Sequence, residues 1–343
     1  MSALSVDSSG LIEMAKYGIP WMGSKQSIAN KIISLLPKAD RFYDLFGGGF
    51  SITHAAMLSK KYKHFHFNEI QPGICELIKD AIAGKYSYQS FKPKFISREE
   101  FFKLKDQDAY IRTVWSFGNS GKSYMFGKDV EPVKRSLHQA VIFGEFDDVA
   151  RKFFGFSKWK TNDLRHRRLI SRRIAGIKLR SGELQQLQQL QQLQQLERLE
   201  RLQQLQQLER LQQLEWLQQL ERLQQLEFTN KDYRQIEIKG NAIVYLDPPY
   251  IGTAEYATPF DYKSFFEYVD GLKHPVFFSE YQAPDKFRCI AHIGKLSLLA
   301  AQDKRTRKLE RIFTNKIGYE LYSDQKAISA NATSNIGPLT APN

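Results

Sequence analysis

The sequence predicts an α/β protein whose parallel sheet is divided by a long insertion. Short apolar runs of strand type alternate with amphipathic helical segments near the N-terminus, and the alternation resumes near the C-terminus. Between these parts lies a segment in which every third residue is leucine. With 343 residues, the chain is long enough for about two domains of the usual ~150 residues.

Hydrophobic residues make up 42% of the chain, which is enough for a core and excludes a wholly disordered protein. Lysine and arginine number 50 against 37 acidic residues, which leaves a formal net charge of +13. Such an excess indicates a polyanionic partner such as nucleic acid, although a basic soluble protein without one is the alternative.

Two cysteines, Cys75 and Cys289, lie too far apart in the sequence to indicate a disulfide framework or a four-cysteine metal site. We therefore expect a reducing, cytoplasmic compartment and no metal. The first residues lack a basic start followed by an apolar run, and nowhere do about 18 apolar residues follow one another. Neither secretion nor a membrane span is expected, and no obligatory protein partner is evident.

The expected elements before the insertion begin with a helix over 27–36, which ends before a proline. Strands and helices then alternate, with a strand over 41–46, a helix over 51–59, a strand over 65–68 and a helix over 74–82. After the insertion, apolar runs typical of strands occur at 242–246 and 276–279.

Three glycines, Gly47 to Gly49, join the strand at 41–46 to the next helix. Glycine lets a backbone turn sharply and approach a ligand closely, at the edge where open α/β sheets bind cofactors. The pattern matches neither G-x-G-x-x-G nor a Walker loop, and a tight turn without a ligand is the alternative. Glu69 ends the next strand, where an acid can hold ribose hydroxyls or simply face solvent.

The tetrapeptide Asp247-Pro248-Pro249-Tyr250 directly follows the strand at 242–246 and is the most specific motif in the chain. Consecutive prolines prevent strand continuation and helix formation, and they hold the preceding residues extended. A carboxylate, a free carbonyl and an aromatic face are thereby presented rigidly. This set suits the exocyclic amine of a base, because the two oxygens accept its hydrogens while the ring stacks on the base. A purely structural turn is the alternative.

Fifteen leucines recur at every third position from Leu184 to Leu226, separated by Gln-Gln, Glu-Arg or Glu-Trp pairs. This composition favours helix. In an α-helix each leucine is rotated about 60° from the previous one, so the apolar stripe circles the helix and forms no coiled-coil seam. A 3₁₀-helix would align the leucines on one edge but is uncommon beyond about 3–4 residues, and a compact solenoid is a third possibility. We expect a long helical segment with partly buried leucines.

The simplest role for the repeat is a spacer that changes length by whole triplets, and a partner-binding surface or a DNA contact are the alternatives. From Glu183 to Glu227 the segment contains seven acidic residues and four arginines, which argues against DNA contact. The net positive charge of the chain therefore lies outside the repeat.

The densest basic run of the chain comes just before the repeat. Lysines and arginines in such a run neutralise phosphates and position a duplex without reading its sequence, and an ordinary solvated helix face is the alternative. The candidate DNA-binding residues are Lys158, Lys160, Arg165, Arg167, Arg168, Arg172 and Arg173.

The motifs of the chain, and the order in which they follow one another, resemble those of the Dam-like class of DNA adenine methyltransferases. IPWMGSK at 19–25 is similar to the family's N-terminal cofactor motif, and DLFGGG at 44–49 is similar to its Phe-x-Gly-x-Gly motif. Glu69 stands where the family usually has an acid, more often aspartate. Asp232-Tyr233 resembles its Asp-Phe element, and the tetrapeptide at 247–250 completes the set.

The resemblance implies a Rossmann-like methyltransferase sheet, S-adenosylmethionine as cofactor and double-stranded DNA as substrate. The implied reaction is methyl transfer to N6 of an adenine turned out of the duplex. It implies catalytic roles for Asp247, Pro248, Pro249 and Tyr250. Cofactor contacts are implied for Trp21, Lys25, Asp44, Phe46, Gly47, Gly49, Glu69, Asp232 and Tyr233. An N4-cytosine methyltransferase, and a DNA-binding or interaction protein without turnover, are the alternatives.

The expected organisation places the catalytic, cofactor-binding part on both sides of two inserted segments. It consists of a first catalytic part over 1–84, a mostly helical target-recognition region over 85–182, the triplet insertion over 183–227, a second catalytic part over 228–327 and a tail over 328–343. The tail is expected to be flexible because its residues are small and polar.

Overall fold

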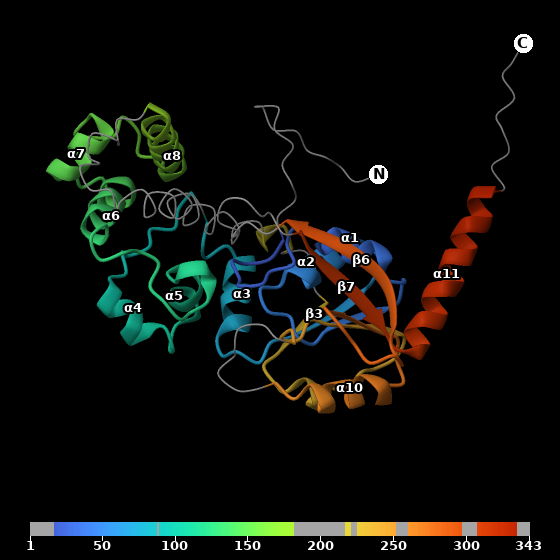
Figure 1. Ribbon diagram of the computed structural model, residues 1–343. Coiled ribbons are helices and arrows are strands. Elements are labelled where there is room, and N and C mark those ends of the chain that lie inside the picture. The colour runs from blue at the N-terminus through green and yellow to red at the C-terminus, as the bar shows by residue number, and fades with distance from the viewer. Residues whose placement is uncertain are drawn as a thin grey trace, which may run out of the picture. The chain divides into compact units, whose positions relative to one another are not determined.

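The computed structural model describes residues 17–87, 89–181, 217–220, 225–251, 260–296 and 307–334 of the protein. The chain forms two compact units, which we describe one at a time (Figure 1). Unit 1 comprises Met1–Tyr17, Lys25–Cys75 and Leu223–Asn343, and unit 2 comprises Gly18–Ser24 and Glu76–Arg222.

Unit 1 is built on a seven-stranded sheet with the strand order β3-β2-β1-β4-β5-β7-β6. The first five strands in that order run parallel, and β7 and β6 form an antiparallel pair at one edge. The strands are β1 (Arg41–Asp44), β2 (His64–Asn68), β3 (Leu226–Thr229), β4 (Ala242–Leu246), β5 (Val276–Glu280), β6 (Arg288–Leu296) and β7 (Arg307–Thr314).

The strand order reverses at the centre of the sheet, between β1 and β4. These strands are paired with Asp44 opposite Tyr245. From β1 the chain proceeds outward to β2 and β3, whereas from β4 it proceeds outward on the other side to β5. Ligands of open α/β sheets bind in the crevice at the carboxyl ends of the strands where the order reverses. The residues that follow β1 and β4 therefore occupy the expected ligand site.

Helices lie on both faces of the sheet: α1 (Ala29–Leu35), α2 (Ser51–Leu58), α10 (Tyr262–Gly271) and α11 (Lys316–Ser334) (Figure 1). Successive residues of a strand point to opposite faces. Val244 of β4 therefore packs in one core with Phe265 of α10. Tyr245 points to the opposite face, which is the side where α2 packs against β1 and β2.

The strand order confirms the α/β class and the Rossmann-like arrangement expected from the sequence. The four expected strands are parallel, as predicted, but the sheet also has an antiparallel edge formed by β7 and β6, which the sequence did not predict. Their sequences, RKLERIFT and RCIAHIGKL, mix charged and apolar residues. Antiparallel edge strands with a solvent-facing side have this composition, which gives no continuous apolar run from which to predict a strand.

The leucine triplets enter the described residues at two places. The helix η4 (Leu217–Leu220) is a 3₁₀-helix, and both of its leucines are buried because residues three apart eclipse one another in that geometry. Leu226, the last triplet leucine, begins β3, which pairs with β2. The expectation of helix is therefore wrong for the final triplet, and the rest of the expected helical segment lies outside the described residues.

Helix α11 packs beside β5, β6 and β7 and ends at Ser334. Residues 328–334 of the expected flexible tail are thus helical, and neither glycine nor proline occurs between residues 319 and 336. Residues 335–343 lie outside the described residues. No helix in the described part of the chain is both long and apolar enough to cross a membrane.

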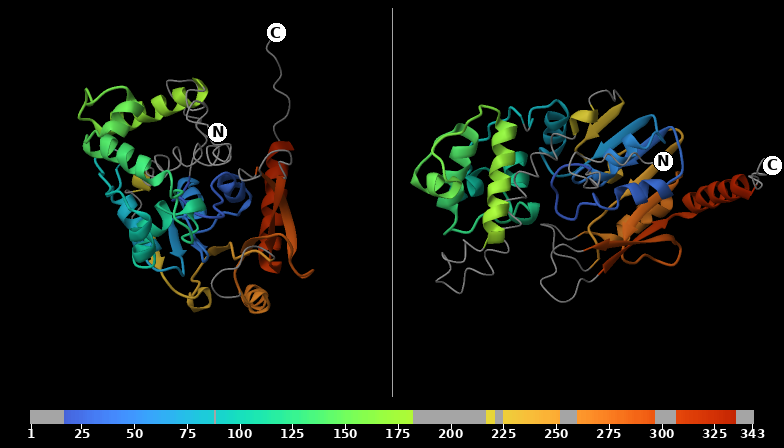
Figure 2. Two further views of the ribbon diagram at one scale, coloured as in Figure 1. Left: turned by 60° about the vertical axis from the view of Figure 1, so that its left-hand side comes forward. Right: turned by 90° about the horizontal axis from the view of Figure 1, so that it is seen from above.

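Unit 2 is mostly helical, as the sequence predicts. It contains the end of α3 (Ile74–Ile82), followed by α4 (Arg98–Leu104), α5 (Ala109–Val114), η1 (Phe117–Asn119), α6 (Glu131–His138), the π-helical turn η2 (Gln139–Phe143), α7 (Asp148–Phe154) and α8 (Leu164–Ser181). Trp115, fully buried, packs edge-on against Phe95 and Phe126. A second core surrounds η2, against which α8 packs (Figure 2).

Candidate active site

The glycine-rich turn connects Asp44, the last residue of β1, to Ser51, the first residue of α2. A Cβ atom on Gly47 would lie 2.0 Å from the ring of Phe67, so only glycine fits at this position. Gly48 has a φ of 49°, a left-handed conformation that glycine adopts without strain. The turn therefore needs glycine for close packing at one position and for backbone conformation at the next.

Glu69 follows β2 and faces this turn. Its Oε2 accepts a hydrogen bond from the backbone N–H of Gly48 at 2.8 Å, and its Oε1 accepts one from the N–H of Gln71 at 2.9 Å. The residue is 6% exposed. These contacts hold an acid beside the glycine turn at the carboxyl edge of the sheet.

Asp44 is 1% exposed and lies at the point where the strand order reverses. Thr53 donates a hydrogen bond to its Oδ2 at 2.7 Å, while Oδ1 is buried and has no hydrogen-bond partner among the described residues. Burial raises the pKa of Asp44 to about 7, and the charges of Asp247 and Glu69 act in the same direction. Asp44 thus offers an unsatisfied oxygen to a donor or a cation.

Asp247 follows β4 and is paired with a buried lysine. Nζ of Lys25 lies 2.7 Å from Oδ2 of Asp247 and 3.5 Å from Oε1 of Glu310. Burial acts to lower the pKa of Lys25, but the charges of Asp247 and Glu310 outweigh it and the pKa lies above its usual value. Oδ1 of Asp247 is buried and, within the described residues, has no hydrogen-bond partner. One oxygen of this carboxylate is therefore fixed and the other is unused.

The ring of Tyr250 is held by contacts on several sides. Its hydroxyl donates a hydrogen bond to Glu310 of β7, and its ring meets that of Tyr281 edge-on at 4.7 Å between centroids. Nζ of Lys25 lies 4.6 Å from the Tyr250 ring centroid, within the range of a cation–π contact.

Burial raises the pKa of Glu310 to about 7 against the opposing charge of Lys25.

Glu280, the last residue of β5, supports the chain just after the tetrapeptide. It accepts hydrogen bonds from the backbone N–H of Tyr281 at 2.7 Å and of Ile251 at 3.2 Å. The residue is 1% exposed, and burial raises the pKa of its carboxyl to about 7. The chain after Tyr250 is therefore tied to the carboxyl end of β5.

An aromatic cluster lies beside the glycine turn. The ring of Phe46 contacts that of Tyr233 at 4.8 Å and that of Phe260 at 5.8 Å between centroids. Tyr233 begins the short helix η5 (Tyr233–Gln235), which Asp232 caps. The carboxylate of Asp232 forms two hydrogen bonds with the guanidinium of Arg234, at 2.7 and 2.8 Å.

Comparison with protein families gives a match across most of the chain. The sequence matches the D12 class N6 adenine-specific DNA methyltransferase family over residues 21–175 and 200–336. The chain belongs to this family. A search of curated proteins finds no match to the sequence. The expected resemblance is thus confirmed, and the protein is a DNA adenine methyltransferase in the general sense of that family. The unmatched stretch between the two matched ranges, 176–199, contains the beginning of the leucine triplets.

The structure of this D12 methyltransferase brings several sequence-predicted residues together within unit 1. Asp247 and Glu69 are both close enough to Asp44 for their charges to raise its pKa. Lys25 joins Asp247 to Tyr250. Gly47 and Gly49 of the turn are buried. In the tetrapeptide, Pro248 is buried and Pro249 is half-buried. Trp21 belongs to unit 2 and is half-buried there.

Three site residues escape sequence reasoning: Glu280, Tyr281 and Glu310. Glu280 directly follows the expected strand at 276–279, just as Asp247 directly follows the expected strand at 242–246, and that signal would have found it. Glu310 lies inside an antiparallel edge strand, where no local pattern marks it.

The predicted DNA-binding residues lie in unit 2 and differ in exposure. Lys158, Lys160, Arg165 and Arg173 are exposed, whereas Arg167 and Arg172 are half-buried. Arg168 is fully buried and donates a hydrogen bond to the carbonyl of Phe91 at 2.7 Å. A phosphate cannot reach Arg168 in this structure, so we do not propose a DNA contact for it.

Proposed function

We propose that this methyltransferase uses S-adenosylmethionine to methylate N6 of an adenine that is turned out of double-stranded DNA. The observation that carries the proposal is a pair of buried carboxylate oxygens without hydrogen-bond partners in the described residues, Oδ1 of Asp44 and Oδ1 of Asp247. Both belong to residues at the reversal point of the sheet, where ligands of such folds bind. Buried oxygens of this kind are costly unless a ligand supplies the missing donors.

The acidic residues at the carboxyl edge of the sheet fit a cofactor that carries positive charge on its sulfonium and amino groups. In our proposal the backbone of Gly47 to Gly49 borders the cofactor, Glu69 binds its ribose hydroxyls and the Asp44 carboxyl attracts its cationic end. Phe46 and Tyr233 form the aromatic wall beside it, with Lys25 as a further contact and Asp232 as the cap that holds Tyr233. When bound, this cofactor supplies an electrophilic methyl group.

Asp247 would act on the target amine through the oxygen that Lys25 leaves unused. The adenine amine is a poor nucleophile because its lone pair is delocalised into the ring. Hydrogen bonds from the amine to Oδ1 of Asp247 and to the carbonyl of Pro248 favour a more tetrahedral nitrogen as attack begins. Such preorganised acceptors stabilise charge that develops in the transition state. Lys25 orients the carboxylate, and Pro249 fixes the backbone.

Tyr250 would form the wall on which the extruded base stacks. Taking a base out of the duplex costs a few kcal/mol, which an aromatic pocket offsets. Contacts with Glu310, Tyr281 and Lys25 fix the ring before the base arrives. A ring that is already immobile loses little entropy when the base binds.

The duplex would be positioned by cations of unit 2. We propose phosphate contacts for Lys158, Lys160, Arg165 and Arg173, which are exposed, and for Arg167 and Arg172, which are half-buried. Arg167 is partly engaged, because it donates hydrogen bonds to Thr161 and Asn162.

The test is transfer of labelled methyl groups from S-adenosylmethionine to DNA, followed by identification of the modified nucleoside. We expect N6-methyladenine from the wild-type protein. Asp247→Ala should abolish transfer and leave cofactor binding nearly intact, whereas Asp285→Ala, at an exposed position of the same unit, should change neither. N4-methylcytosine as the product, or full activity of Asp247→Ala, would overturn the proposal.

A further inference from the structure

A pocket of about 410 Å³ lies within unit 2, where the start of α4, helix α6 and the start of α7 meet. This volume falls within the usual range for ligand pockets, about 300–1,000 Å³. Its charged lining comes from Arg98, Lys128, Glu131, Arg135 and Asp147. None of these residues belongs to the basic run at 158–173 or to the proposed catalytic site.

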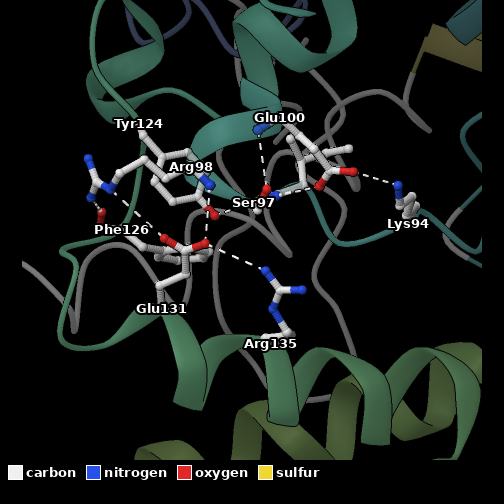
Figure 3. A network of polar contacts seen from close by, with 9 residues as sticks. Lys94, Ser97, Arg98, Glu100, Tyr124, Phe126, Glu131 and Arg135 are labelled. Atoms are coloured by element: carbon white, nitrogen blue, oxygen red, sulfur yellow. Dashed lines mark hydrogen bonds and ion pairs between the residues drawn. The ribbon is translucent and has the colours of Figure 1, made fainter. Parts of the chain in front are cut away.

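Arg98 is fixed in the wall of this pocket (Figure 3). Its guanidinium lies over the ring of Tyr124, 5.1 Å from the centroid, and donates a hydrogen bond to the carbonyl of Phe126. Its backbone N–H donates to Oε1 of Glu131 at 3.1 Å. Nε of Arg98 is buried and, in the part of the chain that the structure describes, has no hydrogen-bond acceptor; Oε2 of Glu131 is 3.9 Å away. The Nε–H group of Arg98 is therefore a hydrogen-bond donor without an acceptor among the described residues.

Arg135 lies one helical turn after Glu131 on α6 and borders the same pocket. Its Nη2 is 3.7 Å from Oε1 of Glu131, and its guanidinium lies over the ring of Phe95, 5.0 Å from the centroid. The side chain remains 54% exposed. Glu131 thus holds two arginines at one site, and Figure 3 shows both guanidinium groups directed at its carboxylate.

The pocket has one more positive charge than negative charges. Both acids of the lining are already engaged, Glu131 by the two arginines and Asp147 by the hydroxyl of Ser136 and the N–H of Ala150. These hydrogen bonds, from Ser136 first, lower the pKa of Asp147, which therefore stays ionised. Three cations face these two acids, and the third cation, Lys128, is exposed.

We propose that this pocket binds one phosphodiester of the DNA substrate, with its adjoining sugar. A phosphodiester carries a single negative charge, which matches the uncompensated charge of the lining, and the volume exceeds that of a phosphate alone. A guanine contact fits less well, because Arg98 already donates to Phe126 and cannot offer its full fork to a base. The inference rests on the proposed function in that the anion is taken to be part of DNA.

The test compares the salt dependence of DNA binding for Lys128→Gln, Arg135→Gln and the double variant of the full chain. Binding of labelled duplexes of two unrelated sequences is measured over a series of salt concentrations. Loss of one phosphate contact makes the slope of log K against log salt shallower by about 0.9. Because both side chains would contact the same phosphate, we expect the double variant to lose about 0.9 and not twice that value.

Matched controls separate the pocket from a general loss of charge. Arg151→Gln is the control for Arg135→Gln. Arg151 is 52% exposed and pairs with Asp148 of its own helix, just as Arg135 is 54% exposed and pairs with Glu131 of its own helix. Lys103→Gln removes an exposed lysine elsewhere in unit 2. Both controls should keep the wild-type slope, and circular dichroism should show that every variant is folded.

Three outcomes would overturn the inference: unchanged slopes in the pocket variants, equal changes in the controls, or a loss confined to one duplex sequence, which would indicate base recognition. The methyl-transfer assay keeps this test separate from the proposed function. A wild-type protein that binds DNA but transfers no methyl group defeats the proposed function alone. Variants that methylate DNA with wild-type salt dependence defeat the pocket alone.

Discussion

Replacement of Lys25 by methionine tests the electrostatic arrangement of the site. Nζ of Lys25 is 2.7 Å from Asp247 and 3.5 Å from Glu310, and the three side chains are 6%, 20% and 5% exposed. Methionine keeps much of the side-chain volume but leaves two buried carboxyl groups without their cation. Removing one partner of a buried ion pair costs about 3–5 kcal/mol, and because Asp247 keeps some solvent contact we expect the lower end, about 3 kcal/mol.

The assay is urea unfolding of the full chain at pH 5 and pH 8. A buried carboxyl whose pKa is raised in the folded protein contributes stability below its unfolded pKa and loses it as the pH rises through the folded value. The pKa of Glu310 is about 7 with Lys25 present. Without the lysine, whose charge lowers that pKa, the folded protein holds this proton still more strongly. The loss caused by Lys25→Met should therefore be larger at pH 8 than at pH 5.

A second substitution and a matched control make this prediction refutable. Glu310→Gln, introduced together with Lys25→Met, should recover part of the loss because the amide carries no charge. Lys63 forms a comparable pair with Asp40, at 3.0 Å, but is 75% exposed. Lys63→Met should cost at most about 1 kcal/mol. A Lys25→Met variant within about 0.5 kcal/mol of the wild type at pH 8 would refute the reasoning.

Three further predictions concern the glycine turn, the aromatic wall and the carboxyl end of β5. Gly47→Ala places a methyl group against Phe67 and should lower the free energy of unfolding by about 1–3 kcal/mol, whereas Gly271→Ala, with no atom within 4 Å of the added carbon, should not show this loss in urea unfolding. Phe46→Ala should weaken S-adenosylmethionine binding in calorimetry, and Phe102→Ala, at an exposed position of α4, should leave it unchanged; equal affinities would remove Phe46 from the proposed cofactor site. Burial raises the pKa of Glu280 to about 7, so the stability that this group contributes at low pH is lost as the pH rises to 7. Glu280→Gln should flatten that decline in unfolding measured at pH 5, 6 and 7, and an unchanged pH profile would contradict the assignment.

The centre of the sheet could be predicted from sequence because its strands are buried on both faces. The expected strand at 242–246 coincides with β4, and the expected helix at 74–82 coincides with α3. Continuous apolar runs that end at glycine or proline leave few alternatives for such strands. The expected strand at 242–246 also places Asp247 directly after β4, where the structure has it, whereas the expected strand at 41–46 runs two residues beyond Asp44, at which β1 ends.

The edges of the sheet could not be predicted in this way. β3 begins within the last leucine triplet, and only its pairing with β2 makes this residue part of a strand. β7 supplies Glu310, whose role depends on the antiparallel pairing that brings it to Lys25 and Tyr250. The pocket around Glu131 likewise depends on how α4, α6 and α7 pack, since its residues are dispersed from 98 to 147 in the sequence.

The central claim is our proposal that the residues at the carboxyl ends of β1 and β4 hold the methyl donor beside the tetrapeptide. A crystal structure of the protein with bound S-adenosylhomocysteine tests it most directly. We predict that the ligand lies along the Gly47 to Gly49 turn, with its ribose hydroxyls on Glu69 and its homocysteine end near Asp44 and Asp247. A ligand bound elsewhere, with Oδ1 of Asp44 still lacking a partner, would contradict the account.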